Sequence, residues 1–326
     1  MNVFETILSH LENGQAVRLE SHYHADEIIR KIANSTDGHP PLSFAAREDG
    51  YCLTETFLPK PRLVILGGGH ISLPLVEMAA KIGFDPLVYD DRSAFANKAR
   101  FPLASQVICA DFAQLTQHIT LLSTDYICVL TRGHQHDILC LKTLFQSSIQ
   151  PFYLGMIGSK RRIAVVKQQV QQAGAQYTKQ LSTLHAPIGL SIGAMTPEEI
   201  AVSILAQLIE KRRKHADGST FRGECTADIH LLRYLAENPA TPKALVTILS
   251  TKGSTPRHSG AKMLVLATGT IIGSIGGGCT EAEVIQIARD VLDVGGFRHI
   301  TLDLTDRAEE LGMVCGGSME VLIEKI

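Results

Sequence analysis

The sequence is short of the residues that mark several large classes of protein. None of its 326 residues is tryptophan and only 6% are aromatic, which argues against a surface that stacks nucleic-acid bases. The net charge is −2 and the basic residues are dispersed, so nothing points to a nucleic-acid or anionic-membrane surface. We therefore expect neither nucleic acid nor membrane among its partners.

Long apolar runs and paired cysteines are missing as well. No stretch approaches the roughly 20 uninterrupted apolar residues of a membrane-spanning helix, and residues 1–11 do not resemble a signal peptide. The seven cysteines are odd in number and form no C-x-x-C pair, which indicates free thiols in a reducing compartment. Four-cysteine spacings typical of iron–sulfur clusters are absent too. We expect a cytoplasmic protein.

The sequence has the length and composition of two folded domains. Hydrophobic residues make up 45% and charged residues 20% of the chain, and its length is about twice the roughly 150 residues of an average domain. In its middle, short apolar segments alternate with helix-sized or loop-sized intervals. Such repeated βα units are typical of a parallel sheet covered on both faces. We predict an α/β fold with a Rossmann-like parallel sheet, its strands at 62–66, 86–89, 106–109, 126–130 and 152–155.

The Rossmann-like domain is predicted to span residues 61–215. It ends in a helix with a clear start, because Thr196 and Glu199 form a capping box around Pro197. Residues 216–226 are a polar linker, and residues 227–326 make a second, smaller α/β or α+β domain, which includes a hairpin around 262–272. Residues 1–60 contain helix candidates at 3–11 and 25–32 and strand candidates at 16–19 and 51–57.

A first candidate site is the glycine loop Gly67-Gly68-Gly69-His70, between the first Rossmann strand and its helix. Glycines let the backbone approach a phosphate, and free N–H groups at a helix start attract an anion. Asp90 ends the second strand, about 20 residues on, where a ribose-binding acid is expected. The loop therefore predicts phosphate or nucleotide binding, NAD(P) included. The alternative is a tight turn that only packs the helix onto the strand.

Two further loops lie at the same expected edge of the sheet. His134 and His136 beside Asp137 are suited to a metal or to proton relay, but no third ligand is evident, so we predict no metal site. The alternative is an aspartate that caps the helix next to solvated histidines. In the next loop Ser159 is a candidate N-cap, and Lys160 and its neighbours place cations at a helix start. An anion would offset the cost of that placement; a solvated basic face is the alternative.

A fourth candidate site lies near the C-terminus. Gly276, Gly277 and Gly278 lead into a helix and could form an anion-binding nest. Cys279 falls in the first turn of that helix, where the dipole favours a thiolate. Cys315, next to two glycines, is the second candidate thiol. A small side chain that merely fits is the alternative for both, and we expect the other five cysteines to serve in packing.

Together these motifs resemble the XdhC/CoxI family, accessory proteins that mature molybdenum hydroxylases such as xanthine dehydrogenase. The resemblance covers both domains. It is carried in the Rossmann-like part by residues 61–70, 90–92, 131–137, 157–161, 185–190 and 192–204, and in the CoxI-like part by residues 253–257, 260–263, 276–281 and 315–317.

The sequence departs from the family pattern in two ways. The CoxI-like domain usually precedes the Rossmann domain, and here the order is reversed, as if the chain were circularly permuted. We therefore predict that residues 1–60 pack with residues 227–326, because chain ends often lie close together at a surface. The second departure is Arg132-Gly133, where many relatives have a histidine after the threonine.

The resemblance implies a protein that binds the molybdenum cofactor, as molybdopterin or its dinucleotide. It would protect this cofactor while a cysteine desulfurase supplies the sulfido ligand, and then deliver it to an apo molybdenum hydroxylase. Cys279 and then Cys315 would be the working thiols, and Arg257 and Lys262 would contact the anionic cofactor. The alternatives are an NAD(P)-dependent oxidoreductase that uses the Rossmann loop, and a small enzyme that modifies the cofactor. The sequence leaves the oligomeric state open, a homodimer included.

Overall fold

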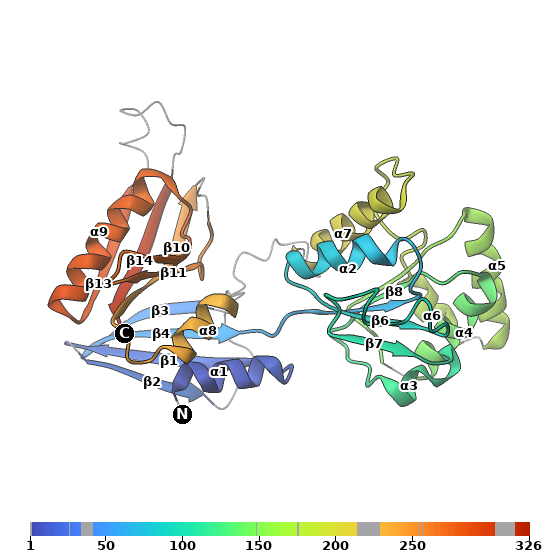
Figure 1. The fold of residues 1–326 in the computed structure, drawn as a ribbon, viewed down its shortest axis with the longest axis horizontal. Helices are drawn as coiled ribbons and strands as arrows, with labels where there is room; N and C mark the ends of the chain where they lie inside the picture. The colour runs from blue at the N-terminus through green and yellow to red at the C-terminus, as the bar shows by residue number, and fades with distance from the viewer. Residues whose placement is uncertain are drawn as a thin grey trace. The chain divides into compact units, whose positions relative to one another are not determined.

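The structure is a computed structural model of the whole chain (Figure 1). It describes residues 2–25, 27–33, 42–147, 149–174, 176–213, 229–253, 255, 257–303 and 317–326. The chain forms two compact units: Lys60–Thr220, called here the Rossmann unit, and a second unit assembled from both ends of the chain, Met1–Pro59 and Phe221–Ile326, called here the terminal unit.

The Rossmann unit is built on five parallel strands in the order β7-β6-β5-β8-β9, which confirms the predicted fold class. From β5 the chain moves outward to β6 and β7, and then returns to form β8 and β9 on the other side. The order therefore reverses between β5 and β8, the position at which open α/β sheets bind ligands. The strands are β5 (Arg62–Leu66), β6 (Asp85–Asp90), β7 (Gln106–Cys109), β8 (Tyr126–Val129) and β9 (Tyr153–Met156).

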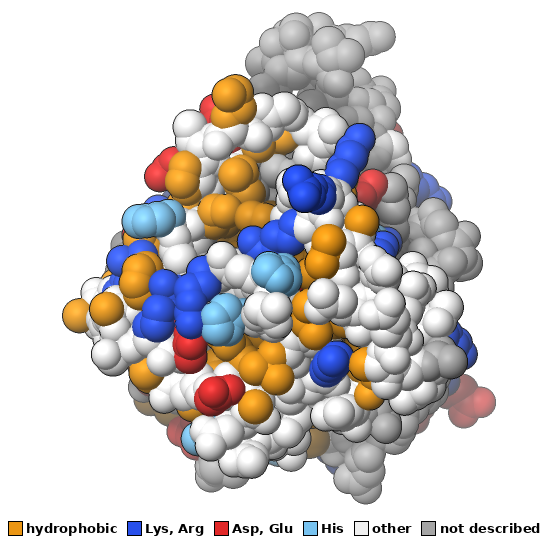
Figure 2. Space-filling model, turned by 90° about the vertical axis from the view of Figure 1, so that its right-hand side faces the viewer, with side chains coloured by type: hydrophobic (Ala, Val, Ile, Leu, Met, Phe, Trp, Pro, Cys, Tyr) orange, Lys and Arg blue, Asp and Glu red, His pale blue; other side chains and the backbone are white. Residues whose placement is uncertain are grey.

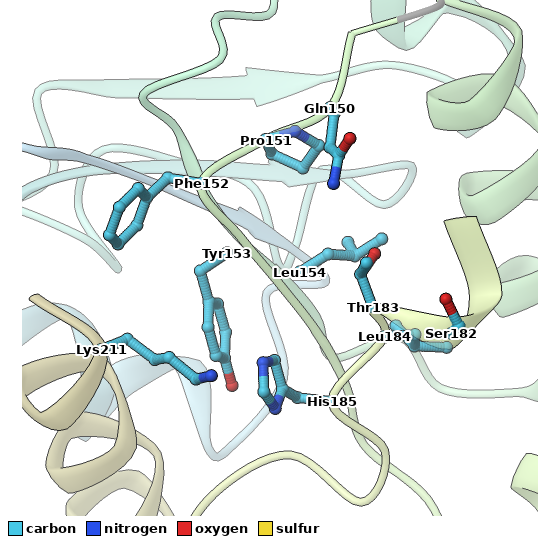
Figure 3. A pocket seen from close by; sticks show the side chains of 10 residues that line it. All are labelled: Gln150, Pro151, Phe152, Tyr153, Leu154, Ser182, Thr183, Leu184, His185 and Lys211. Atoms are coloured by element: carbon cyan, nitrogen blue, oxygen red, sulfur yellow. The ribbon is translucent and has the colours of Figure 1, made fainter. Parts of the chain in front are cut away.

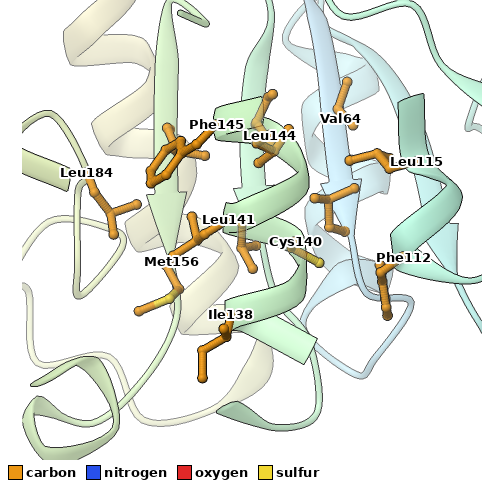
Figure 4. Packing of buried hydrophobic residues seen from close by; sticks show 14 of the residues in the cluster. Val64, Phe112, Leu115, Ile138, Cys140, Leu141, Leu144, Phe145, Met156 and Leu184 are labelled. Carbon is orange, nitrogen blue, oxygen red and sulfur yellow. The ribbon is translucent and has the colours of Figure 1, made fainter. Parts of the chain in front are cut away.

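Helices cover both faces of this sheet, because its strands are apolar on both sides. On one face α2 (Ser72–Lys81) packs with α7 (Pro197–Arg213) through a buried cluster of aliphatic side chains. Figure 4 shows the opposite face, where Ile138, Leu141 and Leu144 of one helix share a core with Met156 of β9. The elements on this second face are η1 (Phe112–Gln114), α3 (Leu115–His118), α4 (His134–Gln146), α5 (Lys160–Ala173) and α6 (Tyr177–Ser182).

The predicted start of α7 is confirmed in detail. The Glu199 N–H donates to Thr196 Oγ1 over 3.2 Å, and the Thr196 N–H donates to the Glu199 carboxylate over 3.1 Å. These reciprocal bonds satisfy two N–H groups that a helix start otherwise leaves unpaired.

The terminal unit contains two antiparallel sheets. One has the order β2-β1-β4-β3 and the other the order β12-β11-β10-β14-β13. The first sheet consists of β1 (Val17–His24), β2 (Glu27–Ala33), β3 (Leu42–Arg47) and β4 (Gly50–Phe57). The second consists of β10 (Lys243–Gly253), β11 (Lys262–Leu266), β12 (Ile271–Gly273), β13 (Phe297–Asp303) and β14 (Gly317–Lys325), and β11 and β12 form the predicted hairpin.

Residues from the two ends of the chain share the cores of this unit. Helices α1 (Val3–Glu12) and α8 (Ile229–Glu237) pack together over residues of both sheets. In a smaller cluster Ile28 of β2 packs near Leu322 of β14. Helix α9 (Gly278–Val294) contributes to a separate core with β10, β11 and β14.

The helix predicted at residues 25–32 is wrong, because this segment is strand β2. It pairs antiparallel with β1 from Arg18 opposite Ala33 to His24 opposite Glu27. Ala25, with φ of 48°, lies in the turn between the two strands. The apolar spacing within the segment is compatible with a helix, and the pairing with β1 decides against it.

In the part of the chain that the structure describes, no helix is both long enough and apolar enough to cross a bilayer.

Candidate functional site

The glycine loop of the Rossmann unit is shaped by close backbone contacts. Gly67 has φ of 117°, its N–H donates to the Tyr89 carbonyl over 2.7 Å, and a Cβ there would lie 2.4 Å from the Leu130 carbonyl oxygen. At Gly68 a Cβ would lie 2.1 Å from the Phe95 carbonyl oxygen. Both positions require glycine because neighbouring backbone, rather than a flexible side chain, fills the space.

Asp90 serves this loop directly. Its buried carboxylate accepts four hydrogen bonds: from the Gly68 N–H over 2.8 Å, and from the Arg92 backbone and guanidinium over 2.9–3.0 Å. A carboxylate offers about four acceptor positions, so Asp90 has none left for the hydroxyls of a ribose. The role that this geometry gives Asp90 is to hold the glycine loop through Gly68, with Arg92 compensating its charge.

The next residues of the loop leave the start of α2 open. A Cβ at Gly69 would have no described atom within 4 Å outside its chain neighbours, and His70 is exposed. Among the described residues, α2 has neither a side-chain cap at Ile71 nor an acidic residue in its first turn. The positive end of the helix dipole is therefore not compensated by a carboxylate of its own helix.

An ion pair crosses the end of β5. Arg132, after β8, donates both terminal nitrogens to Asp91, after β6, at 2.5 and 2.8 Å. Since β5 lies between β6 and β8 in the sheet, this bridge must span the end of the central strand. The Arg132 hydrogen bond is the main reason that the pKa of Asp91 falls to about 2. Arg132 and Asp91 thus join the two sides of the switch point.

The third loop of this edge leads into α5, and one of the three cations at the start of that helix, Arg162, bonds to residues of the preceding loop. Ser159 caps α5, as predicted, by accepting from the Arg162 N–H over 3.2 Å. The Arg162 guanidinium donates to buried Asp137 over 2.7 Å and to the Thr131 carbonyl over 3.0 Å. Burial raises the pKa of Asp137, against the hydrogen bonds from Thr131 and Arg162. Asp137 therefore ties this loop to the preceding one, and Lys160 stays exposed.

Figure 2 shows the face toward which the strands of the Rossmann unit point. Lys and Arg side chains gather there around histidines, with acidic side chains close by. The basic residues on this edge include Arg92, Lys98, Arg100 and Arg132 of the loops and Lys160, Arg161 and Arg162 at the start of α5, and its exposed histidines include His70 and His134. In the described part of the chain no three His, Cys, Asp or Glu residues are grouped as a metal site.

The glycine loop of the terminal unit has a different occupant from the one we expected. Gly276, Gly277 and Gly278 all have positive φ, as in a nest, but the Glu281 carboxylate lies in it. That carboxylate accepts from the N–H groups of Ile275 and Gly277 at 3.0 Å and from Ser274 Oγ at 2.7 Å. Burial raises its pKa, but these hydrogen bonds outweigh burial and the net shift is downward.

Lys262 is also paired with residues of its own unit. We expected it to contact an anionic cofactor, but it is only 7% exposed, and its ammonium donates to Glu55 of β4 and to Thr247 of β10. A buried lysine needs such compensation, so its charge stabilises the junction between the two ends of the chain. Arg257, the other expected anion contact, is exposed.

The candidate thiols are only partly placed. Cys279 is the second residue of α9, but its side chain lies outside what the structure describes, and Cys315 lies wholly outside the described residues. Burial raises the pKa of Cys128 and Cys140, so these two are inert packing residues. Cys109, which we expected to pack as well, is exposed at the end of β7.

Several functional features were not predicted from the sequence. Two of them had a local signal in the sequence. Arg92 lies two residues after Asp90 and carries the opposite charge, and Glu281 is an acid in the first turn of a helix that begins at the last of three glycines. The Asp137–Arg162 and Asp91–Arg132 pairs join residues 25 and 41 positions apart. Such distances leave no local signal in the sequence.

The sequence matches two family models, one in each unit. The XdhC Rossmann domain matches residues 63–208, and the XdhC and CoxI family matches residues 237–303. In this chain the Rossmann domain therefore comes first.

Among curated proteins, one from Bacillus subtilis named as a probable subunit of xanthine dehydrogenase is 35% identical over 165 residues, 48% of this chain and 45% of that protein. The molybdenum cofactor insertion chaperone PaoD of Escherichia coli is 29% identical over 98 residues, 29% of this chain and 31% of that protein. The chain thus spans less than half the length of these two relatives. Among solved structures, a protein described as a xanthine dehydrogenase from Bacillus halodurans is 28% identical, with a TM-score of 0.53 over 67% of this chain and 66% of that one.

Proposed function

Because the chain belongs to the XdhC and CoxI family, we propose that it binds the molybdenum cofactor and supports maturation of a xanthine dehydrogenase-type molybdenum hydroxylase. In this proposal the cofactor is cargo. The protein holds it while a cysteine desulfurase supplies the sulfido ligand, and then passes it to the apo-hydroxylase. Two relatives favour this role, one named as a probable subunit of xanthine dehydrogenase and one as a cofactor insertion chaperone.

The observation that carries the proposal is the open start of α2 at the switch point of the Rossmann sheet. The pterin cofactor ends in a phosphate, and an anion is suited to a helix start that has no acid of its own. Gly69 allows close approach of the backbone, and exposed His70 and Lys160 supply further hydrogen-bond donors on the same edge. We assign these three residues to binding, with Gly67, Asp90 and Ser159 shaping the loops around them.

The competing function is an NAD(P)-dependent oxidoreductase, and in its NAD-dependent form it needs an acid that is free to bind the adenosine ribose. Asp90 stands at that position with all four acceptor positions used by Gly68 and Arg92. The bridge between Asp91 and Arg132 also crosses the end of β5, over which a dinucleotide would extend. These side chains do not suit NAD, so the geometry favours the carrier over an NAD-dependent oxidoreductase.

In the terminal unit, we propose Cys279 as the thiol that contacts the cofactor or its sulfur, with Cys315 as the second candidate and Arg257 as an anion contact. Cys279 lies in the first turn of α9, at the helix start where the Glu281 carboxylate accepts from the N–H groups of the glycine loop. A thiolate is a soft ligand, and the metal of a cofactor that carries sulfur ligands is a suitable partner for it.

The proposal is tested by anaerobic purification of the full chain from cells that synthesise the cofactor. Bound pterin is measured as its fluorescent oxidation product, molybdenum by mass spectrometry, and nucleotides by chromatography of the released ligands. We expect pterin and molybdenum in equal amounts, close to one per chain. Stoichiometric NAD without pterin would contradict the carrier and favour the oxidoreductase.

The role of the thiol is tested with Cys279→Ser, using Cys109→Ser as the matched control because Cys109 is an exposed cysteine of the other unit. Cys279→Ser should lose most of the bound molybdenum, and Cys109→Ser should retain it. Equal retention in both variants would reduce Cys279 to a packing residue and leave cofactor binding itself untouched.

A further inference from the structure

A cavity lies at the opposite end of the Rossmann sheet from the glycine loops, at the start of edge strand β9. Its volume is about 400 Å³, and ten side chains line it, from residues 150–154, from residues 182–185 and from Lys211 of α7 (Figure 3). A cavity of this size lies within the range of small-molecule sites. None of the residues that we assign to cofactor binding belongs to it.

The floor of this cavity, called here the β9 pocket, is rigid. The rings of Tyr153 and His185 stack with centroids 4.9 Å apart and planes 7° from parallel. Tyr153 is 2% exposed and its hydroxyl donates to Gln207. The His185 N–H donates to the Leu154 carbonyl and its own carbonyl accepts from Met156, both at 2.9 Å. A ligand would therefore meet a surface that is already formed.

The side chains that line the β9 pocket carry charge of one sign, although Glu210, next to Lys211, acts on His185 from outside the lining. Lys211 is the one charged residue among the ten that line it. Within the described part of the chain Lys211 has no carboxylate partner. Figure 3 shows its amino group directed toward the Tyr153–His185 pair. A cation that faces a cavity without an acid favours an anionic ligand.

The remaining polar groups suit a ligand that also carries N–H donors. Ser182 and Thr183 donate their hydroxyl protons to the carbonyls of Lys179 and Gln180, at 2.7 and 2.9 Å, so their lone pairs are left to accept. Burial and then Lys211 lower the pKa of His185, against the opposing charge of Glu210, and the net shift favours the neutral ring with one donor and one acceptor nitrogen. Among the described residues no group hydrogen-bonds these ring nitrogens.

An aromatic surface completes the β9 pocket. Phe152 is 53% exposed at its edge, although its ring lies 5.0 Å from the ring of buried Tyr126. A large exposed aromatic side chain beside a polar cavity is a suitable surface for a planar ring. We propose that the β9 pocket binds a small planar aromatic anion that carries an N–H donor, with Lys211 contacting the anion and Phe152 contacting the ring.

The probe for this proposal is 4-aminobenzoate, which combines a carboxylate, a flat ring and an amino group. Its binding to the full chain is measured by saturation-transfer NMR and by calorimetry, beside 4-aminobenzamide, the neutral analogue of the same shape. We expect saturable binding of the acid and at least about tenfold weaker binding of the amide, since charge-assisted hydrogen bonds are the stronger ones.

Lys211→Met should weaken 4-aminobenzoate binding by about tenfold or more, because it removes the charge and keeps most of the side-chain volume. The matched control is Lys81→Met, since Lys81 is the last-turn lysine of α2, as Lys211 is a last-turn lysine of α7. Circular dichroism of both variants establishes that they fold. The proposal is overturned if the native chain shows no saturable binding, if acid and amide bind equally, or if the two variants bind equally.

Discussion

The two glycine loops of this protein look alike in sequence and differ in what fills them. Each contains three glycines at a helix start: Gly67–Gly69 precede α2, and Gly276–Gly278 end at the first residue of α9. In the terminal unit the Glu281 carboxylate occupies the N–H groups of the loop. In the Rossmann unit the N–H groups of Gly67 and Gly68 donate to the Tyr89 carbonyl and to Asp90, which leaves that of Gly69, and among the described residues the first turn of α2 holds no acid.

A glycine-rich turn is therefore available to an anionic ligand only where the chain leaves its N–H groups unpaired. The same holds for cations: Lys262 is paired with Glu55, and Lys160 is exposed beside the open loop. The binding role is thus better supported in the Rossmann unit than at the Gly276 loop.

The largest expected effect comes from Lys262→Met. Glu55 is 3% exposed and would lose its cation within a buried cluster that also contains Glu324, and breaking a buried pair costs about 3–5 kcal/mol. Chemical denaturation should show this loss in the free energy of unfolding, and Lys262→Met combined with Glu55→Gln should recover much of it. Lys160→Met, on the exposed edge, should stay within about 0.5 kcal/mol of the native chain. A stable Lys262→Met protein that had lost its cofactor would restore Lys262 as an anion contact.

A pair of alanine substitutions separates shape from binding within the Gly67 loop. Gly68→Ala should cost about 1–3 kcal/mol of unfolding free energy, because its Cβ would overlap the Phe95 carbonyl. Gly69→Ala meets no described atom within 4 Å, so thermal denaturation should show little change. If Gly69 lies against the cofactor phosphate, the same variant should retain less pterin on anaerobic purification. Full retention of pterin would mean that the phosphate does not bind at Gly69.

The smallest effect is expected for Glu281→Gln, which keeps the side-chain shape but removes the charge. Loss of charge-assisted bonds at a partly exposed site should cost about 1 kcal/mol. The folded-state pKa of Glu281 is lowered, so its stabilisation is present above the unfolded pKa of about 4.3 and is lost as pH falls through the folded value. Denaturation of both proteins from pH 7 to pH 3 should show the difference shrinking in acid. A difference independent of pH would mean that the charge of Glu281 does not hold the loop.

Periodicity and local motifs predict the Rossmann unit well. All five of its strands, the Ser159 cap and the Thr196–Glu199 capping box follow from apolar runs and from short spacings that act within one turn of helix. Residues 25–32 were predicted as a helix because their apolar spacing permits one, and only the ladder with β1 makes them a strand. The glycine loops likewise depend on local backbone freedom, so their positions are readable from the sequence.

By itself the sequence therefore determined the strand segments of the parallel sheet and the glycine loops, because these depend on patterns among near neighbours in the chain. Its motifs also indicated the family. Only the tertiary structure decided which charges remain available. Asp137 with Arg162, Asp91 with Arg132 and Lys262 with Glu55 meet across 25, 41 and 207 positions. Which of these charges meet is decided by which strands lie side by side, and the order of strands in a sheet is not written in any one segment of the chain.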